Sequence, residues 1–591
     1  MKRFYGVVAL AALCILVTAC GGSSSSSSSA NASSTTSGTT SATTSGTTST
    51  ASNAGKIGGK VVIDNVTGST WTCQFSPFNS SVLTTGATFG LIYEPLEYVN
   101  ILQSTKPPTP VLATSSQWSS DDKTLTFTIR SGATWSDGKP FSANDVVYTF
   151  NAMKSDKAID LNALWSDNGG PLTSVALKGT DQVVFTFKAA AQPYFYFVAD
   201  LTPIIPQHIW STLNQSSLHT YTDTKPVGTG PYVMSSCSGQ NVKYLRNPHY
   251  WQSTASHPVP QIAEVDYPAL LSNTPGNLAL SQGQAQWGGQ YIPNIQTFYI
   301  GKDPAHRHIW FPPVGNVSLV PNLTNPLLSN VKVRQAMSYA INREQVSTIG
   351  ESGYELPANQ TAVVVPTFSS SLDNSALASW GNGYDPAKAK ALLESAGFHL
   401  GSDGIMTNAT GDKLQFTVIN VGDYSDWVAS IQVIQQALRA IGIAISPENL
   451  SFNDFEADLS YGKYQLAYCA QPTFGPGVYY ELDNWLNSAN TAPVGKSAAT
   501  NVERYTDSST DALLKQYSTT TDPATQQTIL NQLQQVMLTQ VPIIPVVEGV
   551  DWYQYSTASF TGWPTASNPY ARPPVWAYPD NEQVLLHLSP K

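Results

Sequence analysis

One continuous stretch of this chain combines a strand, a turn and a capped helix, and it restricts the possible folds more than any other. In Thr124–Ile129, threonines alternate with apolar residues, which is typical of a strand with one buried face. Asp137 and Gly138 then favour a tight turn. Ser142 can cap the next helix, and Asp145 stands three residues on, where it completes a capping box. The stretch therefore predicts a β-strand joined by a turn to an α-helix.

Helical and strand patterns alternate through the rest of the chain. Apolar residues recur at helical spacing in residues 331–349 and again in residues 427–441. A shorter helix is expected over residues 385–397, with an aspartate cap at its start and a glycine at its end. Residues 413–421 and 443–445 have strand character. This alternation predicts an α/β fold, and no repeat of solenoid length is present.

The N-terminus has the features of a lipoprotein signal. Lys2 and Arg3 precede an apolar run, residues 7–17, that is too short to span a bilayer but suits the core of a secretory signal. Small residues then lead to Cys20, which resembles the site where a signal is cut and the new N-terminal cysteine receives lipid. A chance cysteine at the end of a signal peptide is the alternative. We predict a signal peptide over residues 1–19 and a lipid anchor on Cys20.

Residues 20–55 are predicted to be a linker between this anchor and a folded body. They are nearly all Ser, Thr, Gly and Ala, which bury too little apolar surface to offset the entropy of ordering. The remainder of the 591 residues is long enough for at least two compact lobes. The net charge of −10, from 30 Lys+Arg and 40 Asp+Glu, argues against nucleic acid as a partner.

Five sequence blocks, in this order, resemble the peptide-binding family of ABC importer solute-binding proteins, which also includes nickel binders. They cover most of the predicted body, so the resemblance is not confined to one motif. The blocks are residues 135–150 (WSDGKPFSANDVVYTF), 226–232 (PVGTGPY), 330–344 (NVKVRQAMSYAINRE), 384–398 (YDPAKAKALLESAGF) and 542–546 (PIIPV).

The resemblance implies an α/β fold of the two-lobed periplasmic-binding-protein type (type II), enlarged by an extra subdomain. Lobe I would comprise residues 56–311, with the subdomain inserted at about 76–200, and lobe II residues 312–544. Residues 545–591 would return to lobe I, so that two crossing strands join the lobes. Ligand would be enclosed by hinge closure.

The resemblance also implies a function in import and no enzymatic activity. The protein would capture oligopeptides at the outer face of the cell membrane, in a periplasm or at the cell surface. It would deliver them as a monomer, without a cofactor, to an ABC permease and its ATPase subunits. Family members that bind a peptide's ammonium group usually carry an aspartate shortly after the strand that matches residues 464–470. Here its nearest match is Phe474, so Glu548 is the replacement candidate, or the ligand has no such charge.

Tryptophans beside amides suggest a second ligand class, oligosaccharides of the cello or xylo type, since flat rings stack on sugar faces. A metal chelate is a third possibility, although His306 and His308 have no partners at a metal-site spacing. A secreted hydrolase is disfavoured because neither G-x-S-x-G nor H-E-x-x-H is present. The predicted ligand contacts are Trp71, Trp287, Gln471, Thr473, Phe474 and Glu548.

Three cysteines remain once Cys14 leaves with the signal and Cys20 is lipidated. Cys73, Cys237 and Cys469 allow at most one disulfide bond. The family layout places Cys73 and Cys237 in the same lobe and so favours a bond between them. Three buried free thiols are the alternative.

Overall fold

The computed structural model describes residues 57–64, 66, 68–78, 86–251, 259–381, 383–470 and 475–591, which belong to one compact unit beginning at Gly55. The predicted signal peptide, Cys20 and the linker to residue 55 lie outside the described residues. Within the part that is described, no helix has both the length and the apolar character needed to cross a bilayer.

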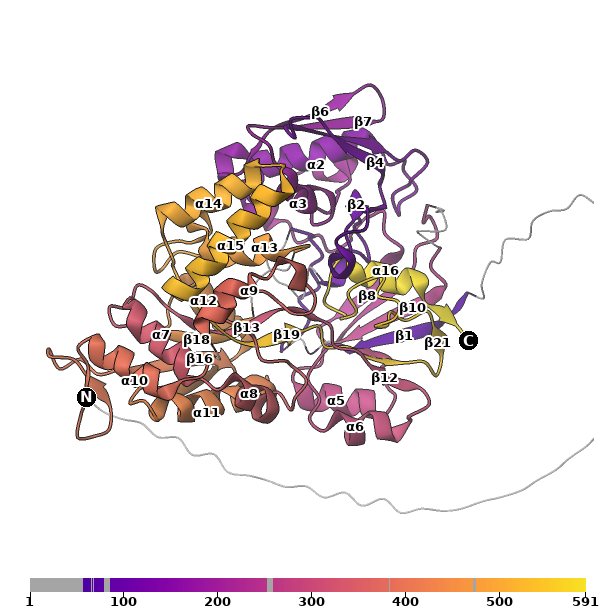
Figure 1. Cartoon of the computed structure of the whole chain (residues 1–591). Helices are drawn as coiled ribbons and strands as arrows, with labels where there is room; N and C mark the ends of the chain where they lie inside the picture. The colour runs from indigo at the N-terminus through magenta and orange to yellow at the C-terminus, as the bar shows by residue number, and fades with distance from the viewer. Residues whose placement is uncertain are drawn as a thin grey trace, which may run out of the picture. The chain divides into compact units, whose positions relative to one another are not determined.

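A seven-stranded sheet contains both the first strand and one of the last (Figure 1). β1 pairs in parallel with β10 on one side and β11 on the other, and β20 pairs antiparallel with both β11 and β12. The strands, in spatial order, are β12 (Arg307–Ile309), β20 (Gln554–Ser556), β11 (Trp287–Gly288), β1 (Gly58–Asp64), β10 (Ile262–Pro268), β9 (Asn241–Arg246) and β8 (Tyr232–Ser238).

Helices cover both faces of this sheet. Val61 and Ile63 share an apolar core with Val584 of α16 (Asp580–His587), whereas Val62 packs with Leu280 of α5 (Asn273–Ser281) on the other face. Alternate residues of one strand point to opposite faces, so α5 and α16 lie on opposite sides of β1. Shorter helices complete this part of the chain: α3 (Phe195–Ala199), α4 (Gln207–Trp210) and α6 (Ile295–Phe298).

The strand, turn and helix unit predicted first is confirmed. β5 (Thr124–Ile129) buries its apolar residues, and α2 (Ala143–Ser155) begins with the expected capping box between Ser142 and Asp145. Phe150 of α2 packs edge-on against Phe185, with ring centroids 4.7 Å apart. The sheet beneath it is antiparallel, in the order β4 (Ala113–Trp118), β5, β7 (Gln182–Phe187) and β6 (Leu172–Lys178).

A five-stranded sheet is formed entirely by strands from the second half of the chain. β16 runs parallel to β17 and β18, and β13 runs antiparallel to β18 and β19. The spatial order is β17 (Ala444–Leu450), β16 (Gln415–Val421), β18 (Leu466–Ala470), β13 (Pro313–Pro321) and β19 (Ile544–Val550). The strands predicted over residues 413–421 and 443–445 are β16 and the start of β17.

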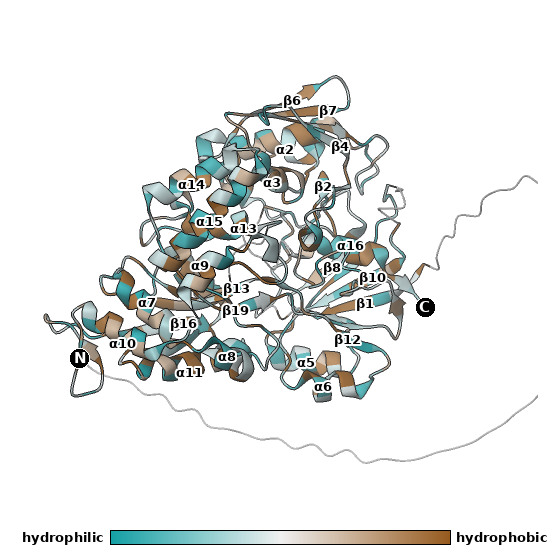
Figure 2. Cartoon of the chain, in the orientation of Figure 1, coloured by the Kyte–Doolittle hydropathy of each residue, from teal (hydrophilic) through white to brown (hydrophobic). Residues whose placement is uncertain are grey.

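Helices also lie on both faces of the five-stranded sheet. The longer of them, such as α11 and α15, combine apolar and polar residues along their length (Figure 2), as expected for helices with one face on a sheet. Val418 packs on the side of α11 and Ile419 on the side of α15. The helices are α7 (Val331–Ala340), α8 (Arg343–Gln345), α9 (Asn374–Trp380), α10 (Pro386–Ser395), α11 (Ser425–Arg439), α12 (Phe452–Tyr461), α13 (Val478–Leu486), α14 (Ser508–Thr519) and α15 (Pro523–Gln540).

The single helix predicted over residues 331–349 is wrong in one respect, because the structure interrupts it. Ile341 and Asn342 have extended backbone, and the Asn342 side chain caps α8 by accepting from the backbone N–H of Gln345. A π-helical turn, Val346–Gly350, follows. Asparagine favours such caps over helix interiors, and its side chain here starts a new element.

Residues 310–312 lead from β12 to β13, and residues 551–553 lead from β19 back to β20, so the chain passes twice between the two large sheets. The remaining strands form three small pairs: β2 (Glu97–Tyr98) with β3 (Thr109–Pro110), β14 (His399–Leu400) with β15 (Met406–Thr407), and β21 (Phe560–Thr561) with β22 (Ser589–Pro590).

Candidate functional site

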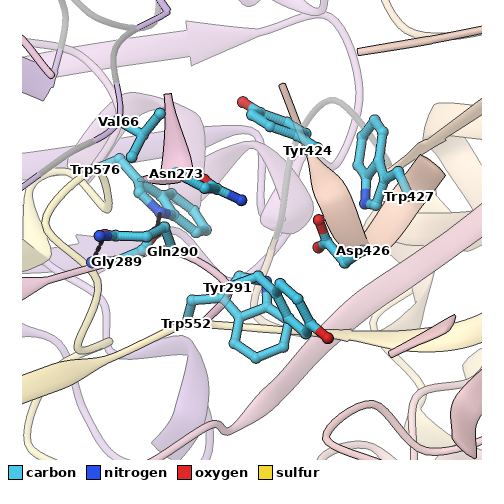
Figure 3. Close-up of a pocket in the computed structure, with 10 residues that line it drawn as sticks. All are labelled: Val66, Asn273, Gly289, Gln290, Tyr291, Tyr424, Asp426, Trp427, Trp552 and Trp576. Atoms are coloured by element: carbon cyan, nitrogen blue, oxygen red, sulfur yellow. Dashed lines mark hydrogen bonds between the residues drawn. The ribbon is translucent and has the colours of Figure 1, made fainter. Parts of the chain in front are cut away.

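A cavity of about 180 Å³ lies between segments that follow strands of both large sheets (Figure 3). Parallel strands of α/β sheets place ligands beyond their carboxyl ends, where loops lead into helices. β1, β11 and β16 all end at this cavity. Its lining residues are Val66, Asn273, Gly289, Gln290, Tyr291, Tyr424, Asp426, Trp427, Trp552 and Trp576.

Buried amides line the side of the cavity nearest β1 and β11. The side chain of Gln290 donates from Nε2 to Oδ2 of Asp64 at 2.8 Å. The backbone carbonyl oxygen of Gln290 accepts from Nε2 of Gln554 at 2.8 Å. Burial raises the pKa of Asp64 to about 7, although the hydrogen bond from Gln290 opposes this shift. The amide of Gln290 is therefore fixed by its neighbours, and Asn273 is buried beside it in the wall of the cavity.

Gly289 allows Trp576 to approach the wall closely. A β-carbon at this position would lie 3.3 Å from Nε1 of Trp576 and 3.2 Å from Cγ2 of Val575. The indole N–H of Trp576 donates to the carbonyl oxygen of Gly289 at 3.4 Å. A side chain at residue 289 would therefore require Val575 and Trp576 to shift by a few tenths of an ångström.

Aromatic rings form much of the remaining lining. Trp552 packs edge-on against Tyr291 and Phe311, with ring centroids 5.5 and 4.9 Å apart. On the other side of the cavity, Tyr424 packs edge-on against Trp427 at 5.1 Å (Figure 3). These faces offer apolar surface to a ligand, while the amides offer donors and acceptors.

A group of buried carboxyls lies at and behind the wall formed by the start of α11. Asp426 lines the cavity and is 4% exposed, and its Oδ1 has no hydrogen-bond partner among the described residues. One turn on, Oγ of Ser430 donates to Oε1 of Glu351 at 2.5 Å. Glu355 is buried close to Glu351.

Burial dominates the electrostatics of these three acids. It raises the pKa of Glu351 and Glu355 well above the usual range, and the neighbouring carboxylate charges raise them further. Burial also raises the pKa of Asp426 to about 6, opposed by the backbone N–H groups of Asp426 and Trp427. Among the described residues, no group of three or more His, Cys, Asp or Glu side chains is arranged to hold a metal ion.

The two predicted tryptophan contacts do not line this cavity. Trp71 is half-buried, donates from Nε1 to the carbonyl oxygen of Tyr267 at 2.9 Å, and packs on its ring at 5.0 Å. Trp287 is fully buried in β11, and its Nε1 donates to the carbonyl oxygen of Pro573 at 2.8 Å. The ring of Trp287 therefore packs in the core in this conformation, and its contact with ligand stays a prediction.

Glu548 is buried in β19 and is not among the residues that line the cavity. Its Oε1 accepts from the backbone N–H of Val365 at 2.7 Å, and burial raises its pKa to about 7. Gln471, Thr473 and Phe474 lie outside the described residues. The structure also joins Cys73 to Cys237, and leaves Cys469 as a buried thiol whose pKa is raised by burial.

None of the described residues that line the cavity is among the predicted ligand contacts. One available signal was the polar and aromatic run Gly422–Trp427 directly after a predicted strand, since strand ends carry sites in α/β sheets. The lining residues that were not predicted are Val66, Asn273, Gly289, Gln290, Tyr291, Tyr424, Asp426, Trp427, Trp552 and Trp576.

This combination, a chain that passes twice between two helix-covered sheets and a cavity at strand ends of both, is the architecture of a solute-binding protein. The family model for bacterial extracellular solute-binding proteins, family 5 (middle), matches residues 107–493. The chain belongs to this family, whose members bind substrates for ABC importers.

Relatives with curated names bind different solutes. The chain is 25% identical over 390 residues to the nickel-binding periplasmic protein of Escherichia coli K12, covering 65% of this chain and 70% of the relative. It is 26% identical over 450 residues to the glutathione-binding protein GsiB of Salmonella typhi, covering 74% and 80%.

A solved structure extends the likeness to nearly the whole chain. It is the mannohexaose-bound periplasmic oligopeptide-binding protein of an oligopeptide ABC transporter from Thermotoga maritima. The two structures align with a TM-score of 0.82 and 25% identity, over 90% of this chain and 98% of that one. The α/β fold predicted from the family resemblance is thereby confirmed.

The buried acids predict that stability falls as pH rises. A carboxyl whose folded-state pKa is raised contributes stability below its unfolded value, near 4.5 for Glu351, and loses it as pH rises through the folded value. We expect wild-type protein to be less stable at pH 8 than at pH 5.5, and Glu351→Gln to reduce that difference by about 1–3 kcal/mol. Urea unfolding at both pH values measures it. The exposed Glu394→Gln is the control, and an equal pH difference in all three proteins contradicts the assignment.

Proposed function

We propose that this protein captures oligopeptides outside the cytoplasm and delivers them, as a monomer, to an ABC permease and its ATPase subunits. The observation that carries this proposal is the cavity, which combines aromatic faces, buried amides and a carboxylate oxygen, Oδ1 of Asp426, that has no hydrogen-bond partner among the described residues. Aromatic faces accept varied side chains, and the amides of Asn273 and Gln290 suit the peptide backbone. The oligopeptide-binding name of the Thermotoga maritima relative supports the same ligand class.

The proposal also includes two lobes with the predicted limits. Lobe I would comprise residues 56–311 and 545–591, and lobe II residues 312–544, so that the cavity would receive residues from both. Ligand would stabilise the closed arrangement by binding it more tightly than the open one. The N-terminal signal would direct export, and lipid on Cys20 would then hold the protein at the outer face of the membrane. No catalysis is proposed.

An oligosaccharide is the second candidate ligand, and a specific observation favours it. Five of the ten lining residues are tryptophan or tyrosine, and two others are amides, which suits stacking on sugar rings with hydrogen bonds to hydroxyls. The Thermotoga maritima relative holds mannohexaose. Titration calorimetry with a tripeptide panel and with cello- and xylo-oligosaccharides distinguishes the two. Sub-micromolar binding of sugars, and none of peptides, overturns the peptide proposal.

Trp552 should contribute strongly to affinity for either ligand, because it forms part of the cavity wall. We expect Trp552→Ala to weaken binding of the identified ligand by about 30-fold, the size of an interface hot spot. Trp552→Phe should retain most of the affinity, because it keeps an aromatic ring against Tyr291. Tyr384→Ala is the control, since Tyr384 is 46% exposed and does not line the cavity. Equal affinities for Trp552→Ala and the control would exclude this cavity as the binding site.

A further inference from the structure

We propose that Asp426 binds a cationic nitrogen of the ligand, so that this cavity selects solutes carrying an amine. The inference deepens the proposed function and rests on it, because it names a chemical group that the captured peptide must present at this site. The acid differs from Glu548, the sequence-based candidate, which does not line the cavity.

The position of Asp426 favours contact with a ligand. Asp426 stands in the first turn of α11, and Figure 3 shows its carboxylate directed into the space enclosed by the other labelled side chains. It is almost completely buried, yet Oδ1 accepts no hydrogen bond from any described residue. A buried carboxylate oxygen without a donor costs several kcal/mol, and such groups in native proteins generally have a partner. A ligand in the cavity is in position to supply it.

The charges around Asp426 also favour a cationic partner. Every titratable group found to interact with Asp426 is an acid or a phenol, and no described residue lining the cavity is Lys, Arg or His. The helix N-terminus and its N–H groups favour the anion on Asp426. Glu351 and Glu355 each accept one hydrogen bond, but burial and the neighbouring carboxylate charges outweigh these bonds and keep both acids protonated. Asp426 is therefore the acid that is ionised at neutral pH. The interacting groups are Glu351, Glu355, Tyr291, Tyr424 and Tyr468.

The surrounding rings favour an organic cation over a metal ion. Trp427 and Tyr424 flank Asp426, and aromatic faces attract ammonium groups. Metal ions instead need several oxygen, nitrogen or sulfur ligands, and the described residues contain no such group. An ammonium group needs only one carboxylate and its aromatic neighbours. Either the amino terminus of a peptide or a lysine-type side chain supplies this chemistry.

The experiment compares tripeptides with a free amino terminus and their N-acetylated forms by calorimetry at pH 7.5. Wild-type protein should bind the free-amine peptides at least about 30-fold more tightly. Asp426→Asn should weaken their binding by about 100-fold and change the affinity of acetylated peptides less than about 3-fold. Asp423→Asn is the matched control, because it removes the same charge from an exposed position three residues away. It should leave both affinities unchanged.

A pH series provides a test that needs no variant. As pH falls through the pKa of Asp426, near 6, its carboxylate gains a proton, so affinity for free-amine peptides should fall between pH 7.5 and pH 5. Affinity for acetylated peptides should stay nearly constant over the same range. Asp426→Asn should show no such fall for either peptide.

Three results would overturn the inference. Equal affinities of wild-type protein for free-amine and acetylated peptides would refute it while leaving peptide capture intact. An equal loss for both peptide forms in Asp426→Asn would assign Asp426 a structural role. If no peptide binds, peptide capture fails, and the same comparison is made with chitobiose in its free-amine and N-acetylated forms. Preference for the free amine then supports the role of Asp426, and its absence refutes that role.

Discussion

Replacing both Cys73 and Cys237 by alanine should lower the free energy of unfolding by about 2–5 kcal/mol. The bond between them closes a loop with a sequence separation of 164, for which chain entropy alone gives about 5 kcal/mol. It ties the segment after β1 to β8, the edge strand of the seven-stranded sheet. The backbone N–H of Trp71 donates to Gly239 nearby, so the bond fixes a segment that is also held by the sheet edge.

Urea unfolding of the double variant, followed by circular dichroism, measures this effect. Wild-type protein treated with a reducing agent should unfold at nearly the same urea concentration as the double variant. Cys469→Ala is the control, because Cys469 is buried but forms no disulfide. A loss below about 1 kcal/mol in the double variant, or no response of wild type to reduction, contradicts the prediction.

Arg572→Ala should cost about 3–5 kcal/mol of stability, because it leaves a buried carboxylate without its counter-charge. Arg572 donates to both oxygens of Asp551, from Nε at 2.9 Å and from Nη2 at 2.8 Å. Both residues are buried, and Asp580 lies close enough to accept from the Arg572 backbone N–H at 2.8 Å. Removing the guanidinium therefore leaves the buried carboxyls of Asp551 and Asp580 without the positive charge between them.

Three variants test this interpretation by urea unfolding. Arg572→Met combined with Asp551→Leu should recover most of the loss, since replacing both charges removes the uncompensated carboxylate. Lys60→Ala, which breaks an exposed ion pair with Asp266, should cost less than about 1 kcal/mol. The prediction fails if Arg572→Ala costs no more than Lys60→Ala. Because the Arg572 guanidinium lies 5.3 Å from the Trp576 ring, ligand affinity should also fall in Arg572→Ala.

Local patterns predicted the local elements well. The alternation of Thr124–Ile129 and the box at Ser142 depend on neighbours within a few residues, and both appear as expected. The helix over residues 331–349 failed because a single asparagine, Asn342, can cap a new helix inside an otherwise regular apolar pattern. Whether the helix continues or restarts at Asn342 depends on the local backbone conformation. The spacing of the apolar residues is the same in both cases, so it cannot distinguish them.

The candidate site was harder to predict because segments distant in the sequence build it. Trp287 has polar neighbours in the sequence, yet its ring lies in the apolar core on one face of the seven-stranded sheet, where it packs edge-on against Trp563 at 5.9 Å. Trp552 and Trp576 reach the cavity more than 250 residues after Gly289, and no local pattern records that pairing. Asp426 follows a correctly predicted strand, so strand ends were the usable signal.

The C-terminal residues contribute β20 to the seven-stranded sheet, so this sheet cannot finish folding before the end of the chain is available. β20 lies between β11 and β12, and Nδ2 of Asn581 in α16 donates to the carbonyl oxygen of Gly86, 495 residues earlier. A ribosome or secretion channel that releases the chain from its N-terminus therefore presents β11 and β12 long before their shared neighbour, β20, arrives. Contacts this distant form slowly. The seven-stranded sheet stays incomplete until the C-terminal residues are available. During export, the chain is therefore expected to remain unfolded enough to pass through a channel.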